Sequence, residues 1–155
     1  MDAPPLERLE PWLAGVMQKL EPRERGRLSR KIGKALRDAN ARRIRDNVQP
    51  DGSPMEPRKP KADKRGRLRR RKGRMFPKTA LARNLKVRTS ADEVEIAFTP
   101  RISGTASVHH FGLTAPVDPK IPNSIEIRYP ARRLLGFAPD DIEAIDKAVM
   151  DHMSG

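Results

Sequence analysis

A strongly basic segment in the middle of the chain constrains what the rest can fold into. Of the 155 residues, positions 56–88 hold 15 basic and 2 acidic side chains, which accounts for the whole formal net charge of +13. Within 58–74 the only apolar side chains are Ala62 and Leu68. Such a segment repels itself and buries almost no surface, so we expect an exposed basic arm or long loop over residues 50–80.

The density of this charge suggests contact with an anionic partner. Lys and Arg side chains can neutralise the phosphates of nucleic acid or face an acidic protein surface, and a solvated loop that aids solubility is a third interpretation. Residues 58–74 hold no aromatic side chain for base stacking, since Phe76 lies just beyond them, which disfavours sequence-specific single-strand binding. The candidate contacts in the arm are Arg58, Lys59, Arg69, Arg70, Arg71 and Arg74.

The two ends of the chain carry helical patterns. Apolar residues three and four apart predict one amphipathic helix over 5–20 and a second that begins near Pro22 and ends before the turn at 49–52. A last helix is predicted from Pro139, where the two following aspartates suit the positive end of the helix dipole. Residues 1–48 are thus expected to form N-terminal helices, and residues 138–153 a C-terminal helix.

Between the arm and the last helix, apolar residues recur at every second position instead of every third or fourth. Alternation at 85–87 and 94–98 predicts an antiparallel hairpin, and residues 125–129 predict a further strand that ends at Pro130. A short helix is expected over 105–110, with Gly112 ending it. We therefore predict one α+β domain over 1–155, in which helices pack on a small antiparallel sheet within 81–137.

The sequence offers little for catalysis. The chain has no cysteine, which excludes zinc fingers, iron–sulfur sites and thiol nucleophiles, and no apolar run is long enough to span a bilayer. The N-terminus lacks the layout of a signal peptide, so we expect a soluble, intracellular protein. His109 and His110 are adjacent and point apart on a helix, which disfavours a shared metal ion. We predict that the protein is no enzyme and binds no cofactor.

Several apolar and basic residues in the second half are candidates for the core or for contacts between subunits. Phe98, Leu134, Leu135 and Phe137 are apolar enough to require burial in one or the other. Phe111 is interpreted either as a buried aromatic at a helix end or as a subunit contact. Arg132 and Arg133 either pair with acidic groups of a neighbour or are solvated.

Three stretches in a fixed order carry a family resemblance. They are 49–59 (QPDGSPMEPRK), 74–78 (RMFPK) leading to Leu85, and 108–112 (VHHFG) followed by 129–137 (YPARRLLGF). Together they resemble the phage virion morphogenesis family, the tail completion proteins of contractile-tailed bacteriophages, over roughly 37–149. Met55 stands where the family pattern has a large aromatic residue, and Ala138 stands where it has a Ser or Thr helix cap.

The resemblance implies structural work without catalysis. It implies a tail terminator or completion protein that forms a ring, a hexamer, on the head-proximal end of the tail tube and enables head–tail joining. The implied partners are the tail tube, the sheath and the neck or head-completion proteins, with possible non-specific DNA contact and no membrane. The implied location is the neck region of the virion tail, after assembly in the host cytoplasm.

Two hypotheses follow for the surface that contacts the partner. Under the tail hypothesis the candidate interface residues are the six basic residues of the arm together with Phe76, Phe111, Arg132 and Arg133. The alternative is a basic nucleic-acid-binding protein that acts through residues 58–88.

Overall fold

The computed structural model of the chain describes residues 6–62, 64–69 and 73–154, and its fold is α+β as predicted. In the described part, strands pair into three two-stranded antiparallel sheets. None of the helices described is long and apolar enough to cross a membrane. The helices are α1 (Leu6–Gln18), α2 (Pro22–Arg45), α3 (Pro100–Phe111) and α4 (Pro139–Ser154). The strands are β1 (Lys61–Ala62), β2 (Leu68–Arg69), β3 (Leu85–Thr89), β4 (Val94–Phe98), β5 (Thr114–Pro116) and β6 (Glu126–Arg128).

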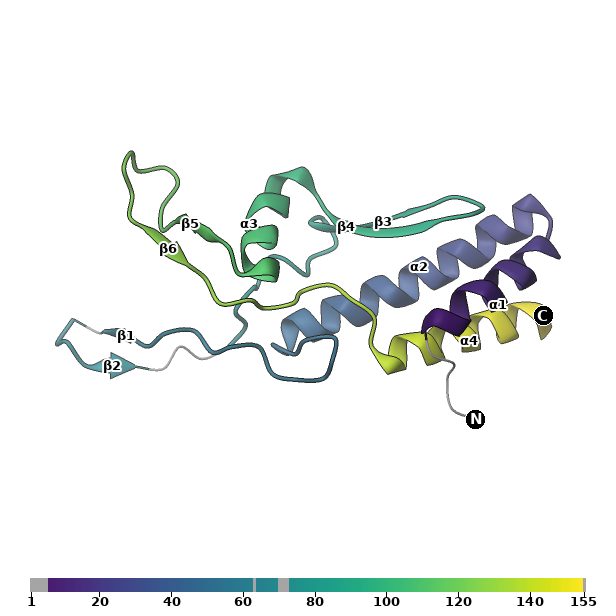
Figure 1. Cartoon of the computed structure of the whole chain (residues 1–155), viewed down its shortest axis with the longest axis horizontal. Coiled ribbons are helices and arrows are strands. Elements are labelled where there is room, and N and C mark those ends of the chain that lie inside the picture. The colour runs from purple at the N-terminus through teal and green to yellow at the C-terminus, as the bar shows by residue number, and fades with distance from the viewer. Residues whose placement is uncertain (1–5, 63, 70–72, 155) are drawn as a thin grey trace.

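The long helix α2 organises the molecule. It starts with Pro22 in its first turn, as predicted, and both α4 and the β3–β4 hairpin pack against it. Figure 1 shows α1 and α4 gathered at one end of α2, while the β1–β2 and β5–β6 hairpins project beyond its other end. The molecule is therefore elongated, with a helical end and a hairpin end.

Two apolar clusters lie along α2. At the helical end, Leu28, Ile32 and Leu36 pack with Ile145 and Val149 of α4, and partly buried side chains of α1 cover them. This confirms the apolar stripes predicted for the second and last helices, because the residues at spacings of three and four are the ones that become buried.

The second cluster joins segments that are distant in the sequence. Residues of the second half of α2, such as Ile44, meet Met55, Leu85, Ala106 and Leu134 there. Leu134 was predicted to be buried in the core or in a subunit contact. It is 1% exposed and lies in the core of the subunit. Met55 is also fully buried, although it is smaller than the aromatic residue of the family pattern.

The β3–β4 hairpin lies close to α2. Its register pairs Leu85 with Phe98 and Thr89 with Val94, which confirms the predicted hairpin. A Cβ atom placed on Gly33 of α2 would lie 2.6 Å from a methyl group of Val87. Glycine at this position lets the helix and the hairpin approach, since a larger residue would push them apart.

Three details of the predicted architecture were wrong. The third helix begins at Pro100, not near 105; its apolar stripe is weak because Ala106 is its one buried residue. The strand β5 was not predicted, since its three residues are mostly exposed and end in Pro116. The strands also do not share one sheet, because β5–β6 lies apart from β3–β4.

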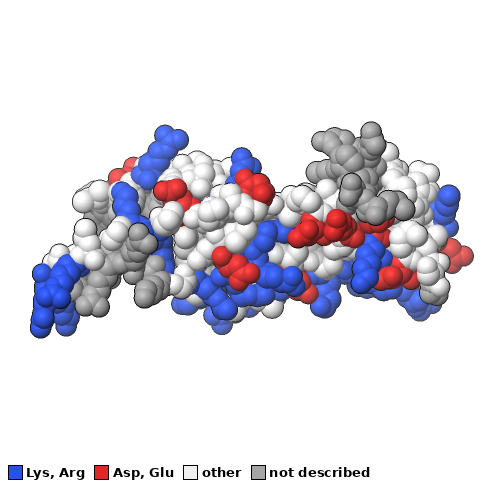
Figure 2. All heavy atoms as spheres, turned by 90° about the horizontal axis from the view of Figure 1, so that it is seen from below, with Lys and Arg blue, Asp and Glu red and all other residues white. Residues whose placement is uncertain are grey.

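The described residues of the basic segment include a small hairpin. β1 and β2 pair antiparallel, with Lys61 opposite Arg69 and Ala62 opposite Leu68. Residues 64–68 are exposed. In Figure 2, Lys and Arg gather at this end of the molecule, whereas basic and acidic residues are mixed over the helices.

A buried ion pair fixes the start of α4. Asp141 is 1% exposed, and its carboxylate accepts hydrogen bonds from both terminal nitrogens of Arg43, at 2.8 and 2.7 Å. The same carboxylate accepts the backbone N–H of Ala138 at 3.0 Å. Asp141 thus forms one half of a capping box, in which a side chain of the first helical turn binds the backbone N–H of the residue before the helix.

This pair separates two neighbouring aspartates that look equivalent in the sequence. Asp141→Ala leaves the Arg43 guanidinium largely buried without its partner, so we expect a loss of about 3–5 kcal/mol in the free energy of unfolding. Asp140→Ala is the matched control, since Asp140 is exposed one position away; it should cost under about 1 kcal/mol. Urea denaturation of both variants makes the measurement, and equal losses would show that only the helix dipole is involved.

Candidate assembly interface

The end of α3 and the returning chain form the base of the hairpin end. Gly112 ends α3 in the left-handed region, at φ 68° and ψ 54°, as its predicted role requires. A Cβ atom there would lie 2.9 Å from the backbone nitrogen of Ala131. The backbone N–H of Arg132 then donates to the carbonyl of His109 at 2.7 Å. The chain that leaves β6 is therefore held tightly across the end of α3.

Both histidines of α3 serve this packing. The ring of His109 lies between Phe76 and Tyr129, with centroid distances of 5.0 and 4.8 Å in edge-on geometry. The Nδ1 atom of His110 accepts the backbone N–H of Leu134 at 3.1 Å. In the described part of the chain, no group of three or more His, Asp or Glu residues is placed to hold a metal ion.

The surroundings keep both imidazoles neutral at pH 7. Burial lowers the pKa of His109, and the Arg132 cation lowers it further. Burial likewise lowers the pKa of His110, with a smaller effect from Arg133. Because the neutral form of His110 offers Nδ1 as an acceptor, its protonation would remove the hydrogen bond to Leu134.

Arg132 is committed within the subunit. Its side chain is buried, and its guanidinium donates to the carbonyls of Glu56 and Pro57, at 2.6 and 3.2 Å. Burial lowers the pKa of Arg132, Glu56 opposes the change and Arg58 adds to it. Arg132 thus ties the start of the basic segment to the base of the hairpin end.

A groove of about 1020 Å³ runs over this base. Five of the ten sequence-predicted interface residues line it, because β6, α3 and the start of the basic segment converge there: Arg58, Lys59, Phe76, Phe111 and Arg132. The groove thus combines an aromatic and apolar floor with cationic groups. We call it the hairpin groove.

The other predicted residues lie outside the hairpin groove. Arg74 is exposed, Arg69 is a backbone member of β2, and Arg70 and Arg71 lie outside the described residues. Arg133 is exposed, and its backbone N–H donates to the side-chain oxygen of Gln49 at 2.9 Å.

An exposed apolar strip continues from the hairpin groove along the β5–β6 hairpin. Phe111 is 66% exposed, so the interpretation as a buried aromatic was wrong and the subunit-contact interpretation stays open. Phe137 is exposed as well. The strip consists of Phe111, Leu113, Val117, Ile121, Ile125 and Ile127. Phe111, Val117 and Ile127 of this strip also line the hairpin groove, and exposed apolar surface of this kind marks interaction sites.

Sequence reasoning missed half of this strip. Leu113, Val117 and Ile121 were not singled out, since they do not alternate with polar residues in a strand pattern. The available signal was the density of large apolar residues between 111 and 127 beside three prolines, in a region where no helix or long strand could bury them.

Comparison with known proteins places the chain in a class of virion assembly proteins. The phage virion morphogenesis family matches residues 5–154, so the chain belongs to that family and the resemblance is confirmed. It is also 35% identical over 153 residues to tail completion protein S of Escherichia phage P2, across 95% of this chain and 96% of the relative. No solved structure matches the chain.

The two histidines make folding stability depend on pH. Their pKa values lie below 6.5 in the folded state, so the unfolded chain binds more protons and stability falls as the pH drops below about 6.5. His110→Asn keeps an acceptor oxygen for Leu134 but cannot titrate. We expect urea midpoints between pH 7.5 and 5 to fall less steeply for this variant than for the wild type. An unchanged slope would show that His110 does not titrate in this range.

Proposed function

We propose that the chain is a structural tail completion protein that forms a ring at the head-proximal end of the tail tube and enables head–tail joining. Its similarity to a tail completion protein supports the general role and a location in the virion tail. In this proposal the ring is a hexamer in the neck region, it contacts the tube, the sheath and the neck proteins, and it assembles in the host cytoplasm. The role needs no catalytic residue and no cofactor.

The observation that carries the ring is the exposed apolar strip. A lone subunit that leaves six large apolar side chains in water loses the free energy that their burial would provide, about 25 cal/mol for each Å² covered. Association with other protein surfaces recovers this free energy. The strip is continuous with the hairpin groove, so one interface can cover both.

The basic segment has a second place in the proposal. Six copies in a ring would bring six strongly basic segments near one another, within reach of repulsion at a Debye length of about 8 Å. An anionic surface must then face them. We propose acidic groups of a protein partner, with DNA as the second choice because residues 58–74 lack aromatic side chains for stacking.

The strip can be tested with a neutral substitution. Phe111→Ser should leave the free energy of unfolding within about 0.5 kcal/mol of wild type, because the side chain is exposed. It should lower the yield of joined virions, counted by electron microscopy. Leu81→Ser is the control, since Leu81 is 41% exposed outside the strip and should change neither quantity. A normal virion yield from Phe111→Ser would contradict the role of the strip.

The basic segment can be tested in the same assay. Replacing Arg69, Arg70 and Arg71 with Ser should leave the melting temperature nearly unchanged and reduce the yield of completed tails or joined virions. The control replaces Arg23, Arg30 and Arg42 with Gln, which removes three exposed charges from α2 and preserves helix propensity. Normal numbers of joined virions from the arm variant would overturn the role of the segment.

The concentration of charge in residues 58–88 supports the alternative, a nucleic-acid-binding protein. The salt dependence of binding to random duplex DNA separates the two proposals. A monomer that binds tightly with a steep salt slope favours the alternative, and a stable ring with weak DNA affinity favours tail completion.

A further inference from the structure

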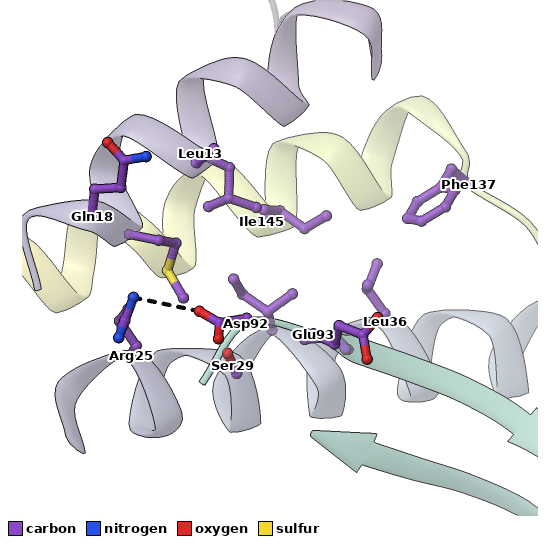
Figure 3. Close-up of a pocket in the computed structure, with 13 residues that line it drawn as sticks. Leu13, Gln18, Arg25, Ser29, Leu36, Asp92, Glu93, Phe137 and Ile145 are labelled. Carbon is purple, nitrogen blue, oxygen red and sulfur yellow. Dashed lines mark ion pairs between the residues drawn. The ribbon is translucent and has the colours of Figure 1, made fainter. Parts of the chain in front are cut away.

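A second hollow lies at the helical end of the molecule. It has a volume of about 560 Å³ and opens between α1, α2, α4 and the β3–β4 turn. Figure 3 shows Leu13, Leu36 and Ile145 lining it, with Phe137 at one end. We call it the helical cleft. None of the ten candidate interface residues lines it, whereas Phe137, which was predicted to be buried in the core or in a subunit contact, does.

The rim of the helical cleft is acidic at one edge. Asp92 and Glu93, in the β3–β4 turn, are both exposed there. Asp92 forms an ion pair with Arg25 at 3.4 Å, drawn as a dashed line in Figure 3, and Glu93 has no ion-pair partner among the described residues. An occupant that suits this cleft is therefore apolar, with a positive charge beside its apolar groups.

The tip of the β5–β6 hairpin has this composition. Val117 and Ile121 are each 57% exposed and Ile125 is 76% exposed. Lys120 is also exposed and directly precedes Ile121. The tip thus presents three large aliphatic side chains and the exposed cation of Lys120 on a narrow projection, while its one carboxylate, that of Asp118, is half-buried and accepts the backbone N–H of Lys120.

The tip is held in shape before any contact. The backbone N–H of Val117 donates to the carbonyl of Ile125 at 2.9 Å, which closes the loop. The N–H of Asp118 donates to the Ser124 hydroxyl at 3.0 Å, and that of Lys120 donates to the Asp118 carboxylate at 2.9 Å. An ordered loop loses less conformational entropy on binding, which favours its use as an inserted element.

The β5–β6 tip and the helices that line the cleft lie toward opposite ends of the long axis (Figure 1). The tip of one chain therefore cannot reach the cleft of the same chain. From this geometry we infer that the β5–β6 tip of one copy inserts into the helical cleft of a second copy, with Lys120 beside Asp92 and Glu93. Such a contact joins two different surfaces, so it continues from copy to copy and closes into a ring when the rotation permits. The inference rests on the proposed ring and identifies the surfaces that build it.

The absence of cysteine allows a direct cross-linking test. Ile121→Cys places a thiol on the tip, and Ala14→Cys places one at an exposed position on the cleft wall. We would treat the purified double variant with a short bis-maleimide and separate the products by denaturing electrophoresis. We expect a ladder of covalent oligomers. Either single variant alone should give no ladder, and a mixture of the two should stop at dimers.

The control pair combines Ile121→Cys with Leu81→Cys, which lies outside the cleft and should give no ladder. Analytical ultracentrifugation without cross-linker gives the oligomeric state separately. Oligomers that cross-link through the tip and cleft support the inference. Oligomers without this ladder overturn it and leave the proposed ring standing, whereas a protein that stays monomeric and uncross-linked overturns both.

A charge placed on the tip gives a second readout. Ile121→Asp should raise the dissociation constant for self-association at least tenfold, because it puts an acid against the acidic rim of an apolar cleft. Its melting temperature as a monomer should match wild type, since the side chain is exposed. Unchanged self-association would contradict insertion of the tip.

Discussion

The ion pair between Arg43 and Asp141 sets the path of the whole C-terminal third. Arg43 projects from the last turns of α2 and also donates to the carbonyl of Gly136 at 3.0 Å, just before α4 begins. Asn40, one turn earlier, accepts the backbone N–H of Gly136 at 3.0 Å. These contacts fix residues 136–141 on α2. Leu134 consequently reaches the second apolar cluster, and α4 is aligned to cover the first.

This anchoring determines which side chains of the hairpin end are exposed. Because Leu134 is held in the core, the chain leading to it must cross the end of α3. There the carbonyl of His109 accepts the backbone N–H of Arg132, and Nδ1 of His110 accepts that of Leu134. The β5–β6 hairpin is then left without a covering layer. Its apolar residues face outward on a supported base, which is the arrangement expected of a subunit that is completed by its neighbours.

The elements with regular apolar spacing could be predicted from the sequence. The stripe of Leu28, Ile32 and Leu36 and the alternation in 94–98 each specify a period, and each formed the expected element. Phe111 could not be placed in this way. Its hydrophobicity indicates burial, but it does not distinguish the core of the same subunit from a contact with another subunit.

Charged residues were harder still to interpret. Asp140 and Asp141 have the same local pattern, and only the position of Arg43, 98 residues away, distinguishes them. Arg132 was interpreted as a partner for acidic groups of a neighbour or as solvated; it is buried, and its guanidinium binds two carbonyls 75 and 76 residues earlier. Long-range partners of this kind leave no periodic trace in a sequence.

A cryo-electron microscopy reconstruction of the head-proximal end of assembled tails tests the account most directly. The account predicts a closed ring of this chain on the tail tube, with the β5–β6 hairpin of every copy covered by protein. A tail end that lacks the chain, or a ring in which the apolar strip of every copy faces solvent, would contradict it.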